Sequence, residues 1–313
     1  MQTIEGQTAK FNNPYQTLDG SERAYVDFNG LKTLWLNTGT RCNLSCENCY
    51  IESTPTNDRL SYLTLEDVEL YLQELRNEDN QALNIALTGG EPFLNPHILK
   101  ILEAILKEGY QTLVLTNAFR VLENKKNGLM KLISTYGDQL QLRVSLDHYT
   151  KEAHEKERGQ GTFDKTLLSV KWLYENGASL SLAGRALINE DINRSKESYQ
   201  DLLREFDIPL KLTEKNLVVF PEMEMDRDVP EITTRCWDIL KKSPDDQMCA
   251  HERMVIKRKE DDSPSVVACT LIAYNKEFDL GKTLKESEKR VQLNHKFCAQ
   301  FCVLGGASCS STL

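Results

Sequence analysis

The stretch LKTLWLNTGTRCNLSCENCY, residues 31–50, joins a short apolar run to three closely spaced cysteines. Cys42, Cys46 and Cys49 follow a CxxxCxxC spacing, which places three thiols in one loop. Such a loop can wrap one face of a [4Fe-4S] cube, and because these clusters normally take four cysteines, one iron is left open for another molecule. A structural zinc site is the alternative, but zinc sites use paired CxxC or Cys/His spacings.

The residues around this loop alternate short apolar runs with amphipathic stretches. Six such β–α repeats predict an α/β fold, a partial (β/α)6 TIM-like barrel whose strands are parallel. Active sites of such barrels gather at the C-terminal ends of the strands, and the cysteine loop follows the first strand. The expected strands are 31–36, 83–87, 112–116, 140–146, 179–188 and 210–220, and the expected helices are 65–76, 96–107, 125–136, 163–176 and 196–206.

The bulk composition excludes several classes of protein. The formal net charge of -9 gives no sign of the basic patch that proteins use to grip nucleic acid. No apolar run is long enough to span a bilayer, and residues 1–15 lack the apolar core of a secretory signal, so we expect a cytoplasmic protein. Nine cysteines in a reducing compartment favour metal or catalytic roles over disulfides.

The repeating pattern ends near residue 221. An acidic segment follows, and after it the chain reads as a hairpin with strands at 253–259 and 265–272, then a short region rich in cysteine and glycine. We therefore expect an N-terminal extension, residues 1–30, packed on the main domain. The other expected units are a barrel at 31–220, a linker at 221–235 and a small C-terminal domain at 236–313.

The motif RCNLSCENCY, residues 41–50, resembles the signature of the radical SAM superfamily. The resemblance implies that Cys42, Cys46 and Cys49 bind a [4Fe-4S] cluster, and that the amino and carboxyl groups of S-adenosylmethionine chelate its fourth iron. Asn48 departs from the pattern, because the family often has an aromatic residue before the third cysteine. Tyr50 supplies an aromatic side chain just after it.

The turn TGGEP, residues 88–92, follows the second expected strand. Its glycines allow close backbone approach, and its glutamate can accept hydrogen bonds from an ammonium group. Together with CxxxCxxC, the turn resembles the one that binds the methionine amino group in the family. Two later strand ends resemble further contacts, and an arginine inside the fifth strand needs a partner or a polar cavity. The expected cofactor-binding residues are Tyr50, Thr88, Gly89, Gly90, Glu91, Pro92, Thr116, Asn117, Ser145, Asp147 and Arg185.

The stretch SLDHYTKEAHEKERGQGTFDKT, residues 145–166, is similar to family members that modify peptides or oxidise alcohols. His154 and Arg158 match a histidine and an arginine of those members. The other reading of both residues is a solvated helix face, and the sequence leaves the two readings open.

The second group of cysteines resembles the auxiliary-cluster modules called twitch or SPASM domains. The resemblance implies one further [4Fe-4S] cluster, because the full SPASM version needs seven cysteines and six are present here. The expected ligands are Cys249, Cys269, Cys298 and Cys302, with Cys309 as a possible replacement. Cys236 is left over, either as buried packing or as a hydrogen-atom donor, and it is the one candidate catalytic residue.

The resemblance implies an oxidoreductase that reductively cleaves S-adenosylmethionine to a 5′-deoxyadenosyl radical. That radical takes a hydrogen atom from a small-molecule or peptide substrate, the auxiliary cluster aids the oxidation, and flavodoxin or ferredoxin supplies electrons. The brief N-terminal region tilts the expectation slightly towards a small molecule or short peptide. A RiPP-type peptide maturase or epimerase is one alternative, and a non-catalytic iron–sulfur or zinc protein is another. RNA modification is disfavoured by the acidic balance.

Overall fold

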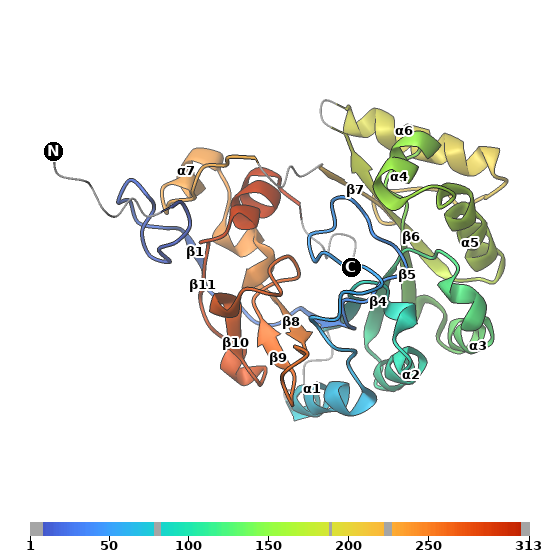
Figure 1. The fold of residues 1–313 in the computed structure, drawn as a ribbon, viewed down its shortest axis with the longest axis horizontal. Coiled ribbons are helices and arrows are strands. Elements are labelled where there is room, and N and C mark those ends of the chain that lie inside the picture. Colours follow the sequence, from blue (N-terminus) through green and yellow to red (C-terminus); the bar gives the residue numbers. More distant parts are fainter. Residues whose placement is uncertain (1–8, 78–82, 188–189, 222–226, 308–313) are drawn as a thin grey trace.

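The computed structural model describes residues 9–77, 83–187, 190–221 and 227–307. Its central feature is a nine-stranded sheet with the order β10-β9-β8-β2-β3-β4-β5-β6-β7, in which β2 to β7 are parallel (Figure 1). The predicted partial (β/α)6 barrel is therefore confirmed. The parallel strands are β2 (Thr33–Asn37), β3 (Asn84–Thr88), β4 (Gln111–Thr116), β5 (Leu140–Ser145), β6 (Ser179–Ala186) and β7 (Leu217–Pro221).

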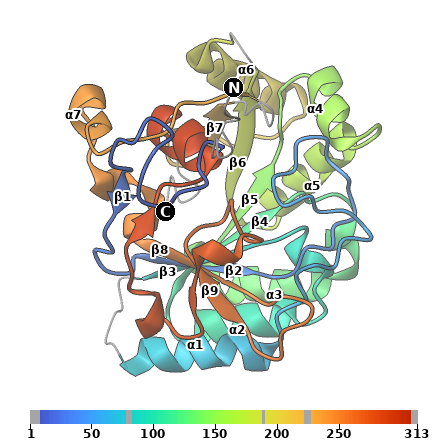
Figure 2. The same cartoon turned by 60° about the vertical axis from the view of Figure 1, so that its left-hand side comes forward.

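Helices cover the outer face of these strands (Figures 1 and 2). The apolar faces of the helices meet the outward-facing strand residues in one large hydrophobic cluster, which is the main core. This arrangement leaves the carboxyl ends of the strands free to build a site. The helices are α1 (Leu65–Asn77), α2 (Ile98–Lys107), α3 (Lys126–Tyr136), α4 (Lys151–Arg158), α5 (Phe163–Glu175) and α6 (Ile192–Glu205).

Local hydrogen bonds explain where two of the helices begin. Thr64 and Asp67 form a capping box at α1, because the Thr64 amide donates to the Asp67 carboxylate at 2.9 Å and the Asp67 amide donates to Thr64 Oγ1 at 3.2 Å. The start predicted for α2 was wrong by two residues. Asn95 lies before α2, which begins only at Ile98: its Oδ1 accepts a hydrogen bond from the His97 amide at 2.8 Å, and its side-chain amide donates to the carbonyls of Thr38 and Leu63.

The second half of the chain extends the barrel sheet. β8 (Glu252–Ile256) pairs in parallel with β2, and β9 (Ser265–Val267) and β10 (Asp279–Gly281) follow in antiparallel register. The predicted hairpin is therefore present, but its second strand is shorter than expected. Cys269 lies just beyond β9 and not within the strand. The proposed division into two domains stays a prediction, and one sheet runs across it.

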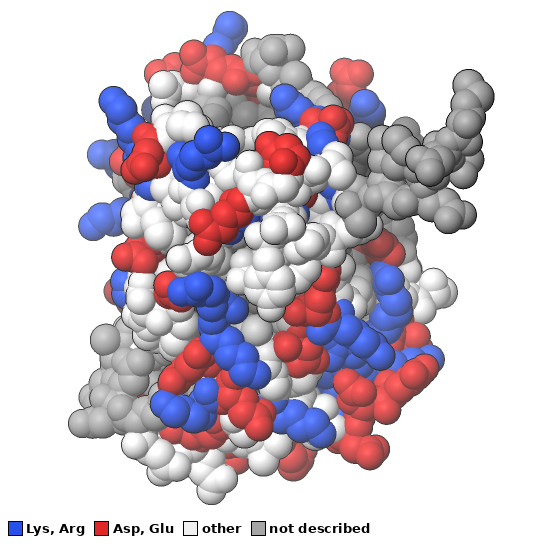
Figure 3. Space-filling view, turned by 90° about the vertical axis from the view of Figure 1, so that its left-hand side faces the viewer, with Lys and Arg blue, Asp and Glu red and all other residues white. Residues whose placement is uncertain are grey.

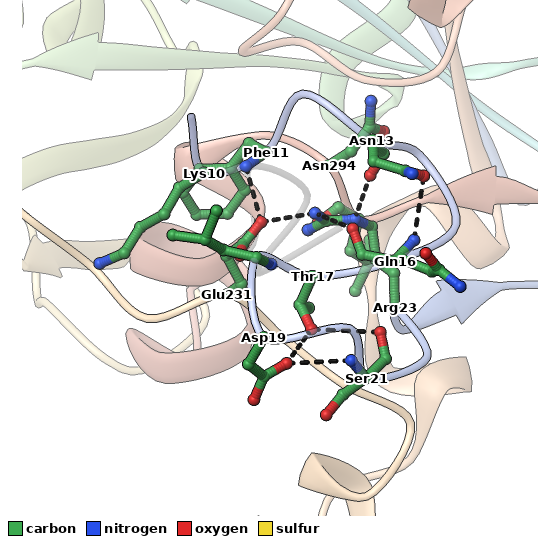
Figure 4. Close-up of polar contacts among 12 residues, drawn as sticks. Lys10, Phe11, Asn13, Gln16, Thr17, Asp19, Ser21, Arg23, Glu231 and Asn294 are labelled. Atoms are coloured by element: carbon green, nitrogen blue, oxygen red, sulfur yellow. Dashed lines mark hydrogen bonds and ion pairs between the residues drawn. The ribbon is translucent and has the colours of Figure 1, made fainter. Parts of the chain in front are cut away.

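The N-terminal segment packs on the second half of the chain, not on the barrel as predicted. β1 (Tyr25–Val26) pairs with β11 (Val291–Gln292), near the short helix α7 (Cys236–Leu240). Arg23 is 1% exposed, and its guanidinium donates to backbone carbonyls and pairs with Glu231 (Figure 4). A buried ion pair with this many hydrogen bonds fixes the path of the segment.

The surface on the side of α7 carries intermixed charges. Figure 3 shows lysine and arginine side by side with aspartate and glutamate on that face, without a continuous basic stripe among the residues drawn in colour. Within the described ranges, every helix is too short or too polar to cross a membrane.

Candidate active site

A cavity of about 210 Å³ opens at the carboxyl ends of the parallel strands. All three cysteines of the CxxxCxxC loop line it, together with the strand ends on which the sequence placed the cofactor contacts. Glu91 and Pro92, which were also predicted as cofactor contacts, are buried and are not among the lining residues. The predicted residues that line the cavity are Cys42, Cys46, Cys49, Tyr50, Thr88, Gly89, Gly90, Thr116, Asn117, Ser145, Asp147 and Arg185.

The two glycines of the TGGEP turn pack directly on the backbone that leads into Cys42. The Gly90 amide donates to the Gly39 carbonyl at 2.8 Å, and the Glu91 amide donates to the Arg41 carbonyl at 3.1 Å. A Cβ on Gly90 would lie 2.3 Å from the Arg41 oxygen. Only glycine therefore allows this approach, and the turn acts as a support for the cysteine loop.

Glu91 organises the strand end next to this turn. Its carboxylate is 1% exposed and accepts hydrogen bonds from Thr116 Oγ1 at 2.9 Å and from the Asn117 amide at 2.8 Å. The Phe93 amide donates to it at 3.0 Å. Because these groups already occupy the carboxylate, Glu91 positions its neighbours in this structure. The sequence could not distinguish that role from contact with an ammonium group.

Burial raises the pKa of Glu91 from 4.5 to about 7. A carboxyl group whose pKa is higher in the folded state contributes stability below pH 4.5 and loses it as the pH rises through 7. We expect Glu91 to remove ~2 to 3 kcal/mol from the free energy of unfolding of the metal-free protein between about pH 5 and about pH 8. Urea unfolding of the protein and of Glu91→Gln at both values measures this. An equal difference between the two proteins at both pH values would contradict it.

The cysteine loop receives hydrogen bonds at two of its sulfurs. The Leu44 amide and Asn117 Nδ2 donate to Cys42 Sγ at 3.4 and 3.5 Å, and the Ser53 amide donates to Cys49 Sγ at 3.3 Å. Burial raises the pKa of Cys42 to about 12 and that of Cys46 to about 11. Free thiols here are therefore protonated at neutral pH, and a bound metal would displace those protons.

Four charged side chains form a network beside the loop. Arg158 Nε donates to Asp147 Oδ2 at 2.6 Å, and the Arg185 guanidinium lies 3.7 Å from Asp147 and 3.2 Å from Glu157. Burial alone would raise the pKa of Asp147, but the two arginines hold it below its usual value. Arg185, in the fifth strand of the barrel, therefore has both the polar cavity and the charged partners that were expected for it.

The lining fits a bound cofactor. Asn37 and Ser53 are 0% and 4% exposed and line the cavity, and Asn37 Nδ2 and Ser53 Oγ have no hydrogen-bond partner within the described part of the chain. Buried polar atoms normally have partners, so a ligand is expected to supply them. Across the described residues, no three His, Cys, Asp or Glu side chains are already arranged as a metal site. The thiols must turn towards one another to share a cluster.

A second, smaller pocket of about 20 Å³ brings four distant cysteines together. Cys249, Cys269, Cys298 and Cys302 all line it, the last two from a short π-helix, Cys298–Leu304. Burial raises the pKa of Cys249 to about 11 and that of Cys269 to about 12. Cys249 is buried and the other three cysteines are half-buried, and this donor set of four thiols fits a [4Fe-4S] cluster. Cys309 lies outside the described residues.

Three other residues singled out in the sequence have different surroundings. Arg158 lines the main cavity, so the solvated-face reading fails for it. It also fails for His154, which is 0% exposed, but this ring packs against Phe163 and is not part of the lining. Cys236 begins α7, accepts a hydrogen bond from the Thr233 amide at 3.4 Å, and lines neither pocket.

Several residues that line the cavity were not predicted from the sequence. Asn37 ends a strand, as Thr88 and Thr116 do, and that pattern could have identified it. Arg143 is a charge within an apolar strand and carries the signal that identified Arg185. Other missed residues come from a loop, from helix α4, from the end of strand β7 or from the part of the chain after the barrel, and no local pattern marked them. They include Ser53, Glu157, Phe220, Thr270 and Phe301.

Comparisons with known proteins agree with this geometry. The model of the Radical SAM superfamily matches residues 36–198. The antilisterial bacteriocin subtilosin biosynthesis protein AlbA of Bacillus subtilis is 33% identical over 144 residues, 46% of this chain and 30% of AlbA. The putative peptide biosynthesis protein YydG of Bacillus subtilis is 36% identical over 99 residues, 30% of this chain and 29% of YydG. The matches thus span under a third of each relative.

A solved structure shares the fold. Streptococcus suis SuiB bound to S-adenosylmethionine superposes with a TM-score of 0.55 at 15% identity, covering 80% of this chain and 63% of SuiB. SuiB bound to its precursor peptide SuiA gives a TM-score of 0.53 at 15% identity, covering 98% and 74%. The family model covers more than half of the chain and includes the cysteine loop, the glycine turn and the strand ends that line the cavity. The chain therefore belongs to the radical SAM superfamily.

Proposed function

We propose that this chain is a radical enzyme that cleaves S-adenosylmethionine and modifies a peptide. The observation that carries the proposal is the single cavity in which three cysteines of one loop meet the polar ends of the barrel strands. Membership of the superfamily implies a [4Fe-4S] cluster and S-adenosylmethionine. When bound, the two groups supply a one-electron cleavage that leads to hydrogen abstraction from a substrate.

Different residues of the chain would bind the cluster and S-adenosylmethionine at this site. Cys42, Cys46 and Cys49 would hold the cluster, and the Leu44 and Ser53 amides would donate to its thiolates. Such hydrogen bonds tune the potential of iron–sulfur sites. The predicted cofactor contacts that line the cavity would hold S-adenosylmethionine. Among them, the polar strand ends can bind its amino, carboxyl and ribose groups.

A peptide is the substrate class that the comparisons favour over a small molecule. AlbA and YydG are named for peptide or bacteriocin biosynthesis, and SuiB has been solved with a precursor peptide. We propose the same class for this chain, as a peptide maturase. Phe220, Thr270 and Phe301 also line the cavity and would contact the substrate.

The second pocket would hold an auxiliary [4Fe-4S] cluster on Cys249, Cys269, Cys298 and Cys302. Two pairs of residues adjacent in the chain connect this pocket with the main cavity. Thr270 and Phe301 line the main cavity, whereas their chain neighbours Cys269 and Cys302 line the second pocket. A substrate against Thr270 and Phe301 would be close enough to pass an electron to the auxiliary site. A flavodoxin or ferredoxin would supply electrons to the first.

The decisive experiment measures 5′-deoxyadenosine. The protein, reconstituted anaerobically with iron and sulfide, should form 5′-deoxyadenosine from S-adenosylmethionine and dithionite. The Cys42→Ala/Cys46→Ala/Cys49→Ala variant should form none, and Glu152→Gln, which changes an exposed residue of α4, should match the parent. Intact clusters without this product would refute the proposal and favour a non-catalytic metal protein.

A further inference from the structure

The loop between the second and third cysteines is tied to the end of helix α4. The Asn48 amide donates to Glu157 Oε1 and Asn48 Nδ2 donates to Glu157 Oε2, both at 2.9 Å. The Glu47 amide donates to the Glu157 carbonyl at 3.0 Å. Three hydrogen bonds therefore connect the two residues between Cys46 and Cys49 to a single residue 109 positions further along the chain.

Glu157 is held in place from its other side. The Arg185 guanidinium lies 3.2 Å from its carboxylate, and the next residue, Arg158, is bonded to Asp147. Glu157 is only 9% exposed. Both carboxylate oxygens of Glu157 are therefore matched by donors from Asn48 and Arg185, and these bonds restrict the orientation of its side chain.

Electrostatics alone does not explain this placement. A nearby carboxylate opposes the ionisation of a thiol, and Glu157 makes a small contribution to the raised pKa of Cys46, behind burial, Asp147 and Cys49. A buried carboxylate also costs free energy unless it is fully bonded. The hydrogen bonds of Glu157 fix the position of the backbone segment that carries two of the cysteines.

We propose that Glu157 is a positioning residue, which acts through Asn48 to hold Cys46 and Cys49 in register for a shared metal centre. We name the pair the Asn48–Glu157 clasp. The inference deepens the proposed function and rests on it, because it requires that the three cysteines bind a cluster. The clasp explains how a loop without regular secondary structure can present two thiols to one site.

Four variants test the clasp. Asn48→Asp places two carboxylates against each other and should open it. Glu157→Gln keeps one oxygen that accepts from the backbone amide of Asn48. Its side-chain NH2 group can donate to Asn48 Oδ1 once the Asn48 side-chain amide flips. The double variant Asn48→Asp/Glu157→Gln keeps the bond from the backbone amide of residue 48 and restores the side-chain bond with donor and acceptor exchanged. Glu152→Gln is the control on the exposed face of α4.

The measurement is the rate at which each reconstituted protein releases iron to a chelator, anaerobically at about pH 8. Asn48→Asp should release iron from its first site about 10- to 100-fold faster than the parent, as is typical when a residue that orients metal ligands is lost. The double variant should recover to within about threefold of Glu157→Gln, and Glu152→Gln should match the parent. Circular dichroism of the metal-free proteins verifies that all are folded.

The outcomes separate this inference from the proposed function. Iron release by Asn48→Asp at the parental rate, or a double variant as fast as Asn48→Asp, would overturn the clasp even if the parent forms 5′-deoxyadenosine. A parent protein that binds iron but makes no 5′-deoxyadenosine would refute the proposed function. The clasp would then still be supported if the exchanged pair restored iron retention.

Discussion

Replacing Gly90 by alanine should lower the rate of 5′-deoxyadenosine formation at least ~100-fold. The added Cβ would lie 2.3 Å from the Arg41 carbonyl oxygen and 2.7 Å from that of Thr40. Both obstacles are backbone atoms, so no side chain can rotate away. The turn and the segment before Cys42 must therefore separate, which displaces the first cysteine from its partners. Displacement of a reacting group by about 1 Å is enough for a loss of this size.

A matched glycine separates this effect from general destabilisation. Gly109 has a φ of 88°, and a Cβ there would meet nothing within 4 Å. Gly109→Ala should therefore cost about 1 kcal/mol of stability through its backbone conformation and leave 5′-deoxyadenosine formation at the parental rate. Chromatographic assay of both variants, with urea unfolding alongside, gives the comparison. A Gly90→Ala protein with normal activity would show that the turn does not support the loop.

The sequence predicted the barrel because its strands are short runs of residues that are buried, either on both faces of the strand or on the face towards the core. Runs such as 84–88 and 140–145 are short and mostly buried, and in parallel sheets their carboxyl ends meet at one edge. That rule alone brings Thr88, Thr116 and Ser145 into one cavity. The CxxxCxxC spacing added the thiols, because three cysteines within eight residues cannot lie far apart.

The parts that the sequence did not predict depend on contacts between distant segments. Glu157 and Asn48 are separated by 109 residues, and nothing in either local pattern marks the pair. The N-terminal extension was predicted to pack on the barrel, yet Arg23 forms a buried ion pair with Glu231 in the second half of the chain. Such pairings are decided by tertiary packing, which local periodicity does not encode.

Loss of the second cysteine group should halve the iron content of the protein without stopping the cleavage of S-adenosylmethionine. The two cysteine sets line separate cavities, and those from the second half of the chain do not border the main one. The Cys249→Ala/Cys269→Ala variant loses two of four thiols, so the second cluster should not assemble. The parent should hold about eight iron atoms per chain and this variant about four. The barrel site should be unaffected, because its own ligands are unchanged.

Iron analysis, 5′-deoxyadenosine assay and mass spectrometry of a peptide substrate test this division together. We expect 5′-deoxyadenosine at near the parental rate but at least ~100-fold less modified peptide, because the electron removed from the substrate has no acceptor beyond Thr270 and Phe301. Cys236→Ala removes a cysteine that lines neither cavity and should keep all of the iron. Four iron atoms in the parent, or peptide modification that survives in Cys249→Ala/Cys269→Ala, would show that the second cysteine group holds no working cluster.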